Sequence, residues 1–168
     1  MIKARTDPSI TEGARRFLEE YITPEMNVLE FGAGGSTIWF ARNARKVITI
    51  EHNEVWFDYI SEQLKQENLS PKARIILSEQ PYNNVPISLG LTFDLILIDG
   101  RDRVLCAESS CGLLNPGRYM MLDNSNRTRY NKIFSMLNGW EKYSHTQKRP
   151  DEYGTFSMDW TTTWWRKP

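Results

Sequence analysis

Apolar residues along this chain form short unbroken aliphatic runs, separated by stretches with the three- to four-residue spacing of an amphipathic helix. The runs predict seven β-strands, at residues 27–31, 46–51, 73–77, 93–100, 119–123, 140–145 and 155–165. The helical stretches fall at residues 9–21, 36–43, 53–67, 102–114 and 130–138. Strands that alternate with helices predict a parallel sheet joined by right-handed crossovers.

Local signals refine this pattern. Ser9 to Glu12 has the spacing of a capping box, and the helix that follows it is expected to pack outside the first strand. Residues 79–91 contain prolines, asparagines and a glycine, which favour an irregular loop. The last two strands lie too close in sequence for a helical crossover, so they should pair antiparallel. The expected fold is α/β: a single doubly wound, mostly parallel seven-stranded sheet with an antiparallel last strand, in one domain spanning residues 1–168.

The first predicted strand ends in a glycine-rich turn that reopens as a helix. Gly32 and Gly34 lie in this turn, and glycine has no Cβ to keep a ligand away from backbone N–H groups. The second strand ends in Glu51, about twenty residues after the first glycine, where an acid can accept both hydroxyls of a ribose. The turn and the acid together predict a cofactor that contains a nucleoside.

Composition narrows the classes of protein. The chain of 168 residues has 40% apolar and 25% charged residues, as ordinary globular domains do. No window is apolar enough for a membrane span, and the start lacks the apolar region of a signal peptide. The two cysteines suggest neither a disulfide framework nor a zinc site, so we expect a reduced, cytoplasmic setting.

Charge gives weaker guidance. The formal net charge is zero, which does not support nucleic-acid binding. The sequence has 10 Lys/Arg and 14 Asp/Glu in residues 1–100, against 11 and 7 in residues 101–168, so the halves differ by eight charges (−4 against +4). A basic second half is compatible with an anionic substrate and equally with an ordinary solvated surface.

The set of motifs resembles the class I S-adenosylmethionine-dependent methyltransferases over nearly the whole chain. Their first turn reads acid-x-Gly-x-Gly-x-Gly, matched here by Glu30, Gly32 and Gly34, with Ser36 in place of the last glycine. The resemblance implies that the turn carries the methionine end of S-adenosylmethionine and that Glu51 holds its ribose. It also implies adenine contacts from Ser78 and Glu79, and a site acid, Asp99, at the end of the fourth strand.

Two narrower resemblances concern the acceptor side. Catechol- and caffeoyl-CoA-type O-methyltransferases carry an acid after the fourth strand and Asp-Asn after the fifth. That resemblance implies a Mg²⁺ or Ca²⁺ site at Asp99, Asp123 and Asn124, although Asp102 stands where those enzymes have a lysine. Small bacterial and phage-type methyltransferases are similar in the segments Ile98–Arg103 and Asp123–Tyr130, and their substrates are mostly unassigned.

Each candidate side chain has a functional and a structural interpretation. Glu30 is expected to orient the loop amides or the amino group of the cofactor, and His52 either flanks the adenine or lies in a surface turn. The candidate catalytic residues are Asp99, Asp123 and His145, with Asp99 and His145 as candidate bases and Asp99 also near the cofactor's methyl group. Besides metal binding, Asp123 and Asn124 are candidate substrate ligands or part of a structural turn. The arginines near these strand ends are candidate clamps for a carboxylate or phosphate, or solvated charges: Arg101, Arg103, Arg127 and Arg129.

The function predicted from the sequence is methyl transfer from S-adenosylmethionine to a small-molecule acceptor, most simply through an oxygen nucleophile. The alternative is a non-catalytic subunit that keeps the fold and the cofactor site. The intact Glu30, Gly32, Gly34 and Glu51 favour the enzyme. The chain leaves little room for a separate substrate domain, so a second copy in a homo-oligomer is a further way to complete the pocket.

Overall fold

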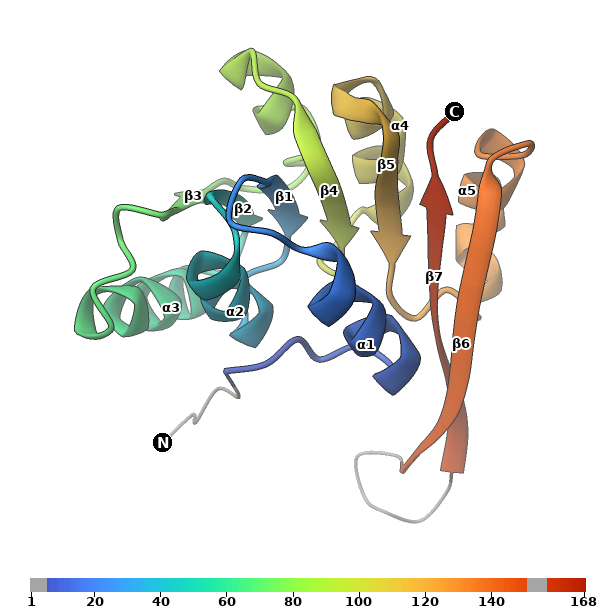
Figure 1. Cartoon of the computed structure of the whole chain (residues 1–168), viewed down its shortest axis with the longest axis horizontal. Coiled ribbons are helices and arrows are strands. Elements are labelled where there is room, and N and C mark those ends of the chain that lie inside the picture. The colour runs from blue at the N-terminus through green and yellow to red at the C-terminus, as the bar shows by residue number, and fades with distance from the viewer. Residues whose placement is uncertain (1–5, 151–156) are drawn as a thin grey trace.

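The computed structural model describes residues 6–150 and 157–168, which form one seven-stranded sheet flanked by helices (Figure 1). The strand order is β3-β2-β1-β4-β5-β7-β6. Strand β7 runs antiparallel to both of its neighbours, which confirms the predicted fold class. The strands are β1 Asn27–Phe31, β2 Lys46–Glu51, β3 Ala73–Leu77, β4 Phe93–Ile98, β5 Leu114–Leu122, β6 Glu141–Pro150 and β7 Ser157–Arg166.

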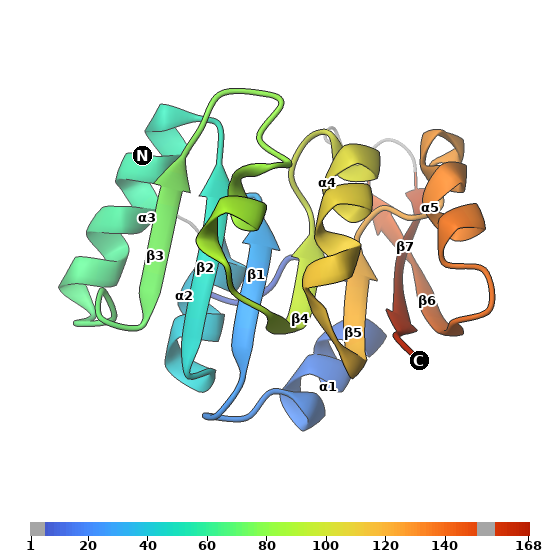
Figure 2. The same cartoon turned by 90° about the horizontal axis from the view of Figure 1, so that it is seen from above.

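Helices cover both faces of the sheet, with α1, α2 and α3 on one face and α4 and α5 on the other (Figure 2). Alternate residues of β1 supply the two cores: Val28 packs with the first group and Leu29 with the second. This division follows from the two-residue period of a strand. The helices are α1 Glu12–Tyr21, α2 Gly35–Asn43, α3 Glu54–Gln66, α4 Arg103–Ser110 and α5 Asn131–Met136.

Helix α1 differs from its prediction in start and in packing partner. It begins at Glu12, and the Thr11 side chain makes no capping bond; the Thr11 amide donates instead to the Thr162 hydroxyl at 3.1 Å. The ring of Phe17 lies 5.2 Å from that of Trp164 on β7. The helix therefore packs over the β5–β7 end of the sheet, and the predicted placement outside β1 was wrong.

Strand β5 begins at Leu114, five residues earlier than predicted, and includes the Asn-Pro-Gly sequence at residues 115–117, between the predicted helix and the predicted strand. The register of β5 on β4 is interrupted between Phe93 and Leu95, so Pro116 lies where regular pairing is broken. A proline lacks the N–H that an interior strand residue donates, and this irregular stretch requires none.

Strand β6 continues to Pro150, well beyond the predicted end at His145, and pairs with β7 from Glu141↔Arg166 to Pro150↔Ser157. Residues 155 and 156 of the predicted last strand lie outside the described residues. The resulting hairpin extends past the rest of the sheet (Figure 1). His145 is consequently in the interior of a strand, where it cannot occupy the strand exit that we expected.

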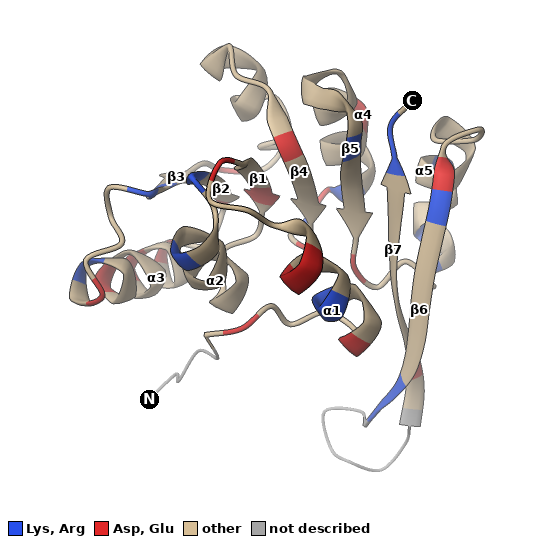
Figure 3. Cartoon of the chain, viewed as in Figure 1, with Lys and Arg blue, Asp and Glu red and all other residues tan. Residues whose placement is uncertain are grey.

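Two surface properties follow from this arrangement. Val55, an apolar residue in the first turn of α3, is 63% exposed and does not belong to the core. Acidic and basic residues are interspersed along elements such as α1 and β6 (Figure 3). None of the helices within residues 6–150 and 157–168 has the length and apolar character needed to cross a bilayer.

Candidate cofactor and acceptor site

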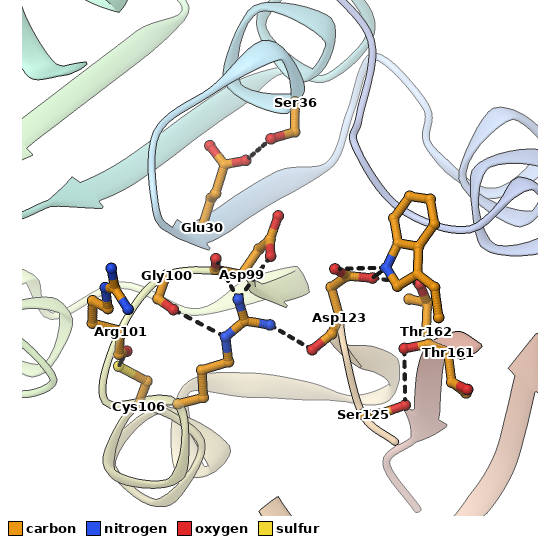
Figure 4. Close-up of polar contacts among 12 residues, drawn as sticks. Glu30, Ser36, Asp99, Gly100, Arg101, Cys106, Asp123, Ser125, Thr161 and Thr162 are labelled. Atoms are coloured by element: carbon orange, nitrogen blue, oxygen red, sulfur yellow. Dashed lines mark hydrogen bonds and ion pairs between the residues drawn. The ribbon is translucent and has the colours of Figure 1, made fainter. Parts of the chain in front are cut away.

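A cavity of about 540 Å³ lies at the carboxyl ends of β1, β2 and β4, where open parallel sheets bind ligands. The predicted turn supplies one wall, and the ends of β2 and β4 supply Glu51 and Asp99. The sequence-predicted residues that line it are Gly32, Gly34, Ser36, Glu51, His52, Asp99, Arg101, Arg103, Asn124 and Arg127. Figure 4 shows polar contacts at the ends of β1, β4 and β5, together with partners of these residues on β7.

The two glycines of the turn serve different purposes. Gly32 has φ +98°, and a Cβ there would approach the Cα of Gly100 to 2.8 Å. Only glycine combines that backbone conformation with so close an approach. Gly34 is extended and faces open space, so its missing side chain leaves room inside the cavity.

Glu30 is fully buried beneath the turn and does not line the cavity. Its carboxylate accepts a hydrogen bond from Ser36 (Figure 4). It also accepts from Thr37 at 2.6 Å and from Thr49 at 2.8 Å. Burial raises the pKa of Glu30 to about 7, although the three hydroxyl donors oppose the shift. Glu30 was expected to orient either the loop amides or the amino group of the cofactor. Its contacts favour a role in the loop, but through hydroxyl groups at the start of α2 instead of amides.

Glu51 connects the glycine turn to the end of β2 through hydrogen bonds from backbone amides. One carboxylate oxygen accepts the amide of Ala33 at 2.7 Å, and the other accepts the amides of His52 and Asn53 at 2.8 and 2.7 Å. The side chain of Asn53 in turn accepts from the Trp56 amide and caps α3, as the sequence predicted. A carboxylate oxygen accepts two hydrogen bonds, so the oxygen bound to Ala33 keeps one position for a ligand hydroxyl.

Asp99 and Arg103 connect the ends of β4 and β5. The guanidinium of Arg103 donates to Asp99 Oδ1 at 3.1 Å and to the backbone carbonyls of Asp99, Gly100 and Asp123 (Figure 4). The Asp99 side chain remains 26% exposed, whereas that of Arg103 is 8% exposed. Burial and the nearby Asp123 carboxylate raise the pKa of Asp99 above its usual range, and Arg103 opposes the shift.

These bonds change the role predicted for Arg103. Four of its hydrogen bonds go to protein oxygens, so the guanidinium fixes two strand ends and has little capacity left for a substrate anion. Asp99, by contrast, keeps one carboxylate oxygen without a protein donor among the described residues. That oxygen can accept a proton from a group placed in the cavity.

Asp123 was expected to face the same cavity, but its carboxylate points toward β7 (Figure 4). Its oxygens accept from Thr162 at 2.6 Å and from the Trp160 indole at 2.9 and 3.1 Å, and the residue is 2% exposed. Burial raises the pKa of Asp123 against these donors. The prediction of Asp123 as a catalytic group facing the cavity was wrong in its orientation.

The same contacts bear on the predicted Mg²⁺ or Ca²⁺ site. Hard cations need several free oxygen ligands, but Asp123 is occupied by Trp160 and Thr162, and Asp99 is paired with a guanidinium. No group of three or more His, Cys, Asp or Glu within the described parts of the chain is placed to hold a metal ion. The residues therefore do not fit a divalent cation at Asp99, Asp123 and Asn124.

Three other predicted residues lie away from the cavity lining. Ser78 and Glu79 follow β3 outside it, although the Ser78 amide donates to the Glu51 carbonyl at 2.9 Å. His145 Nδ1 accepts the Gly13 amide at 3.3 Å, so this histidine contacts α1. Strand periodicity gave these residues a position in the fold but no direction for their side chains.

The cavity also includes residues that the sequence did not point to: Asp7, Ser9 and Trp56. Asp7 and Ser9 belong to the segment before α1, which no cofactor motif marks. Trp56 lies in the first turn of α3, close to Glu51, and this position brings it to the cavity. Its proximity in sequence to Glu51 was the one available signal.

Comparison with known proteins supports the fold. No protein-family model matches the chain, and no curated protein matches it in sequence. Among solved structures, precorrin 8w decarboxylase from Methanobacterium thermoautotrophicum has a TM-score of 0.71 at 15% identity, with both chains fully covered. An rRNA methylase from Streptococcus thermophilus has a TM-score of 0.71 at 12% identity, covering 96% of this chain and 100% of the other.

The O-methyltransferase TomG from Streptomyces achromogenes, involved in tomaymycin synthesis and solved in complex with S-adenosylmethionine, is also similar. Its TM-score is 0.68 at 18% identity, over 86% of this chain and 74% of that one. These three proteins are named for different activities, while their TM-scores of 0.71, 0.71 and 0.68 show that they share the fold of this chain. The chain therefore has the Rossmann-like fold of the S-adenosylmethionine-dependent methyltransferases.

Proposed function

We propose that this protein transfers a methyl group from S-adenosylmethionine to a small acceptor, most simply to an oxygen nucleophile. The observation that carries the proposal is the cavity in which Glu51, the open backbone of Gly34 and the partly exposed Asp99 meet. Solved structures of the same fold, such as TomG with its bound S-adenosylmethionine, add support at the level of topology.

The cavity residues divide according to the parts of the cofactor. Glu51 is placed to accept a ribose hydroxyl, and Trp56 offers an aromatic surface at the same end of the cavity. The α-amino group of a methionine moiety is a cation and needs an acceptor. Glu30 is engaged with three hydroxyls, whereas Asp7 lines the cavity and its carboxylate has no hydrogen bond or ion pair among the described residues. We assign the ammonium to Asp7.

The transfer step requires a nucleophile in line with the methyl group and a place for its proton. An acceptor oxygen forms the new bond to the methyl carbon, and the carbon–sulfur bond breaks with its electron pair moving to sulfur. The acceptor proton passes to the free carboxylate oxygen of Asp99. Positioning accounts for most of the rate, because a sulfonium methyl needs little further activation.

Calorimetric titration with S-adenosylmethionine and its demethylated product tests the proposal. Micromolar binding of either, followed by release of S-adenosylhomocysteine in a screen of hydroxyl-bearing acceptors, is the expected result. Absence of binding to both molecules would overturn the cofactor assignment. Binding without turnover on any acceptor would favour a non-catalytic subunit of the same fold.

A further inference from the structure

A second cavity, of about 410 Å³, opens beside the cofactor cavity on the far side of the β4–α4 connection. The two cavities share Gly100, Arg101, Arg103 and Arg127 in their walls. The backbone that follows Asp99 therefore belongs to the walls of both cavities. A molecule held in the second cavity has the proposed proton acceptor as a near neighbour.

The second cavity is lined by more positive than negative charge. Arg101, Arg127 and Arg129 are exposed in its wall, and none of them forms an ion pair within the described residues. The one acid in the lining, Asp102, accepts the side-chain amide of Gln80 at 2.9 Å. Arg103 also lines the cavity, but its bonds to three carbonyls and to Asp99 keep it in place between the strands.

Tyr130 organises the arginines on one side. Its ring lies 5.0 Å from the guanidinium carbon of Arg129 and 5.5 Å from that of Arg103. Such cation–π contacts restrict the direction of an otherwise mobile side chain. The exposed Arg129 is therefore partly preorganised at the cavity while its N–H groups stay free of protein acceptors among the described residues.

Tyr82, which does not itself line the cavity, fixes the backbone that carries Arg101. Its hydroxyl accepts the Arg101 amide and donates to the Arg101 carbonyl at 3.1 Å. The ring stacks on Phe31 at 6.0 Å and is fully buried. Arg101, which lines both cavities, thus extends from a backbone segment that is held in place.

We propose that this cavity binds a carboxylate or phosphate of the methyl acceptor, held by Arg101, Arg127 and Arg129. Planar guanidinium groups match the paired oxygens of such anions, and unpartnered arginines retain the donors needed. This inference rests on the proposed function: an acceptor anchored here through its anion places a neighbouring hydroxyl toward Asp99. The acceptor class is then an anionic small molecule that also carries a nucleophilic oxygen.

The test uses the full chain saturated with S-adenosylhomocysteine, so that the cofactor cavity is closed to competing anions. Inorganic phosphate and succinate are titrated separately at constant ionic strength, with binding followed by protein amide shifts in NMR spectra. Arg127→Gln and Arg129→Gln remove one guanidinium each. Arg74→Gln, on the exposed face of β3, is the matched control for charge.

Removal of a charge-assisted contact should weaken anion binding by about tenfold in Arg127→Gln and in Arg129→Gln. Arg74→Gln should bind like wild type. Whichever of phosphate and succinate binds wild type more tightly indicates whether the cavity prefers a phosphate or a carboxylate. Equal affinity in all four proteins, or no saturable binding of either anion to wild type, would overturn the proposal.

Binding of S-adenosylhomocysteine is measured first in the same samples, which separates the two levels of inference. If the product binds and neither anion does, the methyltransferase proposal stands and the anion site fails. If the product does not bind, the acceptor role fails with the cofactor assignment, whatever the anions do.

Discussion

Gly32 and Gly100 touch backbone to backbone where β1 and β4 end. A Cβ on Gly32 would reach the Cα and N of Gly100 at 2.8 and 2.9 Å, and a Cβ on Gly100 would reach the Gly32 amide nitrogen at 3.0 Å. The glycine turn that begins at Gly32 is therefore in direct contact with the segment that leads to Arg101. This contact explains why the two cavities share a wall.

Gly100→Ala should destabilise the fold by about 1–3 kcal/mol, as overpacking of a close-packed site does. The new methyl group would meet the Tyr82 hydroxyl as well as Gly32. Urea unfolding of wild type and variant measures the difference. Gly34→Ala is the matched comparison, because its Cβ would meet nothing within 4 Å. Gly34→Ala should keep its stability and lose affinity for S-adenosylmethionine. Equal destabilisation of both variants would contradict the different roles given to Gly100 in packing and to Gly34 in leaving room for the ligand.

Glu51→Ala should weaken S-adenosylmethionine binding by more than tenfold, on the order of 1.5–3 kcal/mol for a lost charge-assisted hydrogen bond. The variant also loses the hydrogen bonds that the backbone amides of Ala33, His52 and Asn53 donate to Glu51. Calorimetry gives the affinities directly. Glu79→Ala is the control, because Glu79 follows the neighbouring strand β3 and lies outside the cavity. A larger effect at Glu79 than at Glu51 would show that the ribose lies elsewhere.

The sequence predicted the sheet well because its central strands are short, unbroken aliphatic runs, which are typical of buried parallel strands. The ranges 27–31, 46–51 and 73–77 agree with the structure residue for residue. Prediction was poorer where tertiary contacts override local signals. The Asn-Pro-Gly sequence within β5 lies at an irregular stretch of pairing, and the capping box before α1 is replaced by a bond from Thr11 to Thr162.

The structure places Gly32 and Glu51 together at one cavity, as expected from positions where the backbone itself sets the geometry. Prediction was less successful where the direction of a side chain depends on a distant partner. Asp123 ends the expected strand, yet its carboxylate is drawn to Trp160 and Thr162, which lie 37 and 39 positions later. Nothing near Asp123 in the sequence reports such a contact.

Glu30→Gln should flatten the dependence of stability on pH. The pKa of Glu30 is raised from 4.5 to about 7, so the folded state holds a proton that the unfolded state releases. Stability is fully present below about 4.5 and falls as pH rises toward 7, by about 3 kcal/mol for such a shift. Glutamine carries no charge and keeps hydrogen-bonding capacity toward the hydroxyls of Ser36, Thr37 and Thr49. Urea midpoints for both proteins at pH 5 and pH 8 measure the effect, and parallel pH dependences would refute it.

Removal of divalent cations should leave turnover unchanged, because the carboxylate of Asp123 is engaged by protein donors and Asp99 is paired with Arg103. Initial rates in chelator, compared with rates after addition of Mg²⁺ or Ca²⁺, provide the check. Loss of activity in chelator that Mg²⁺ restores would mean that Asp123 turns out of its contact with Trp160 during catalysis.

Asp99→Asn should lower turnover far more than cofactor affinity, because the amide cannot accept the acceptor's proton. The pKa of Asp99 is raised above its usual range by burial and by Asp123. The carboxylate is the active form, so the wild-type rate should climb with pH through that raised pKa, above the value of about 3.9 for an ordinary aspartate. The variant should lack this ascending limb. Asp58→Asn, on the exposed surface of α3, is the control and should retain the limb. An equal loss of turnover and of cofactor affinity in Asp99→Asn would instead make Asp99 a cofactor contact alone.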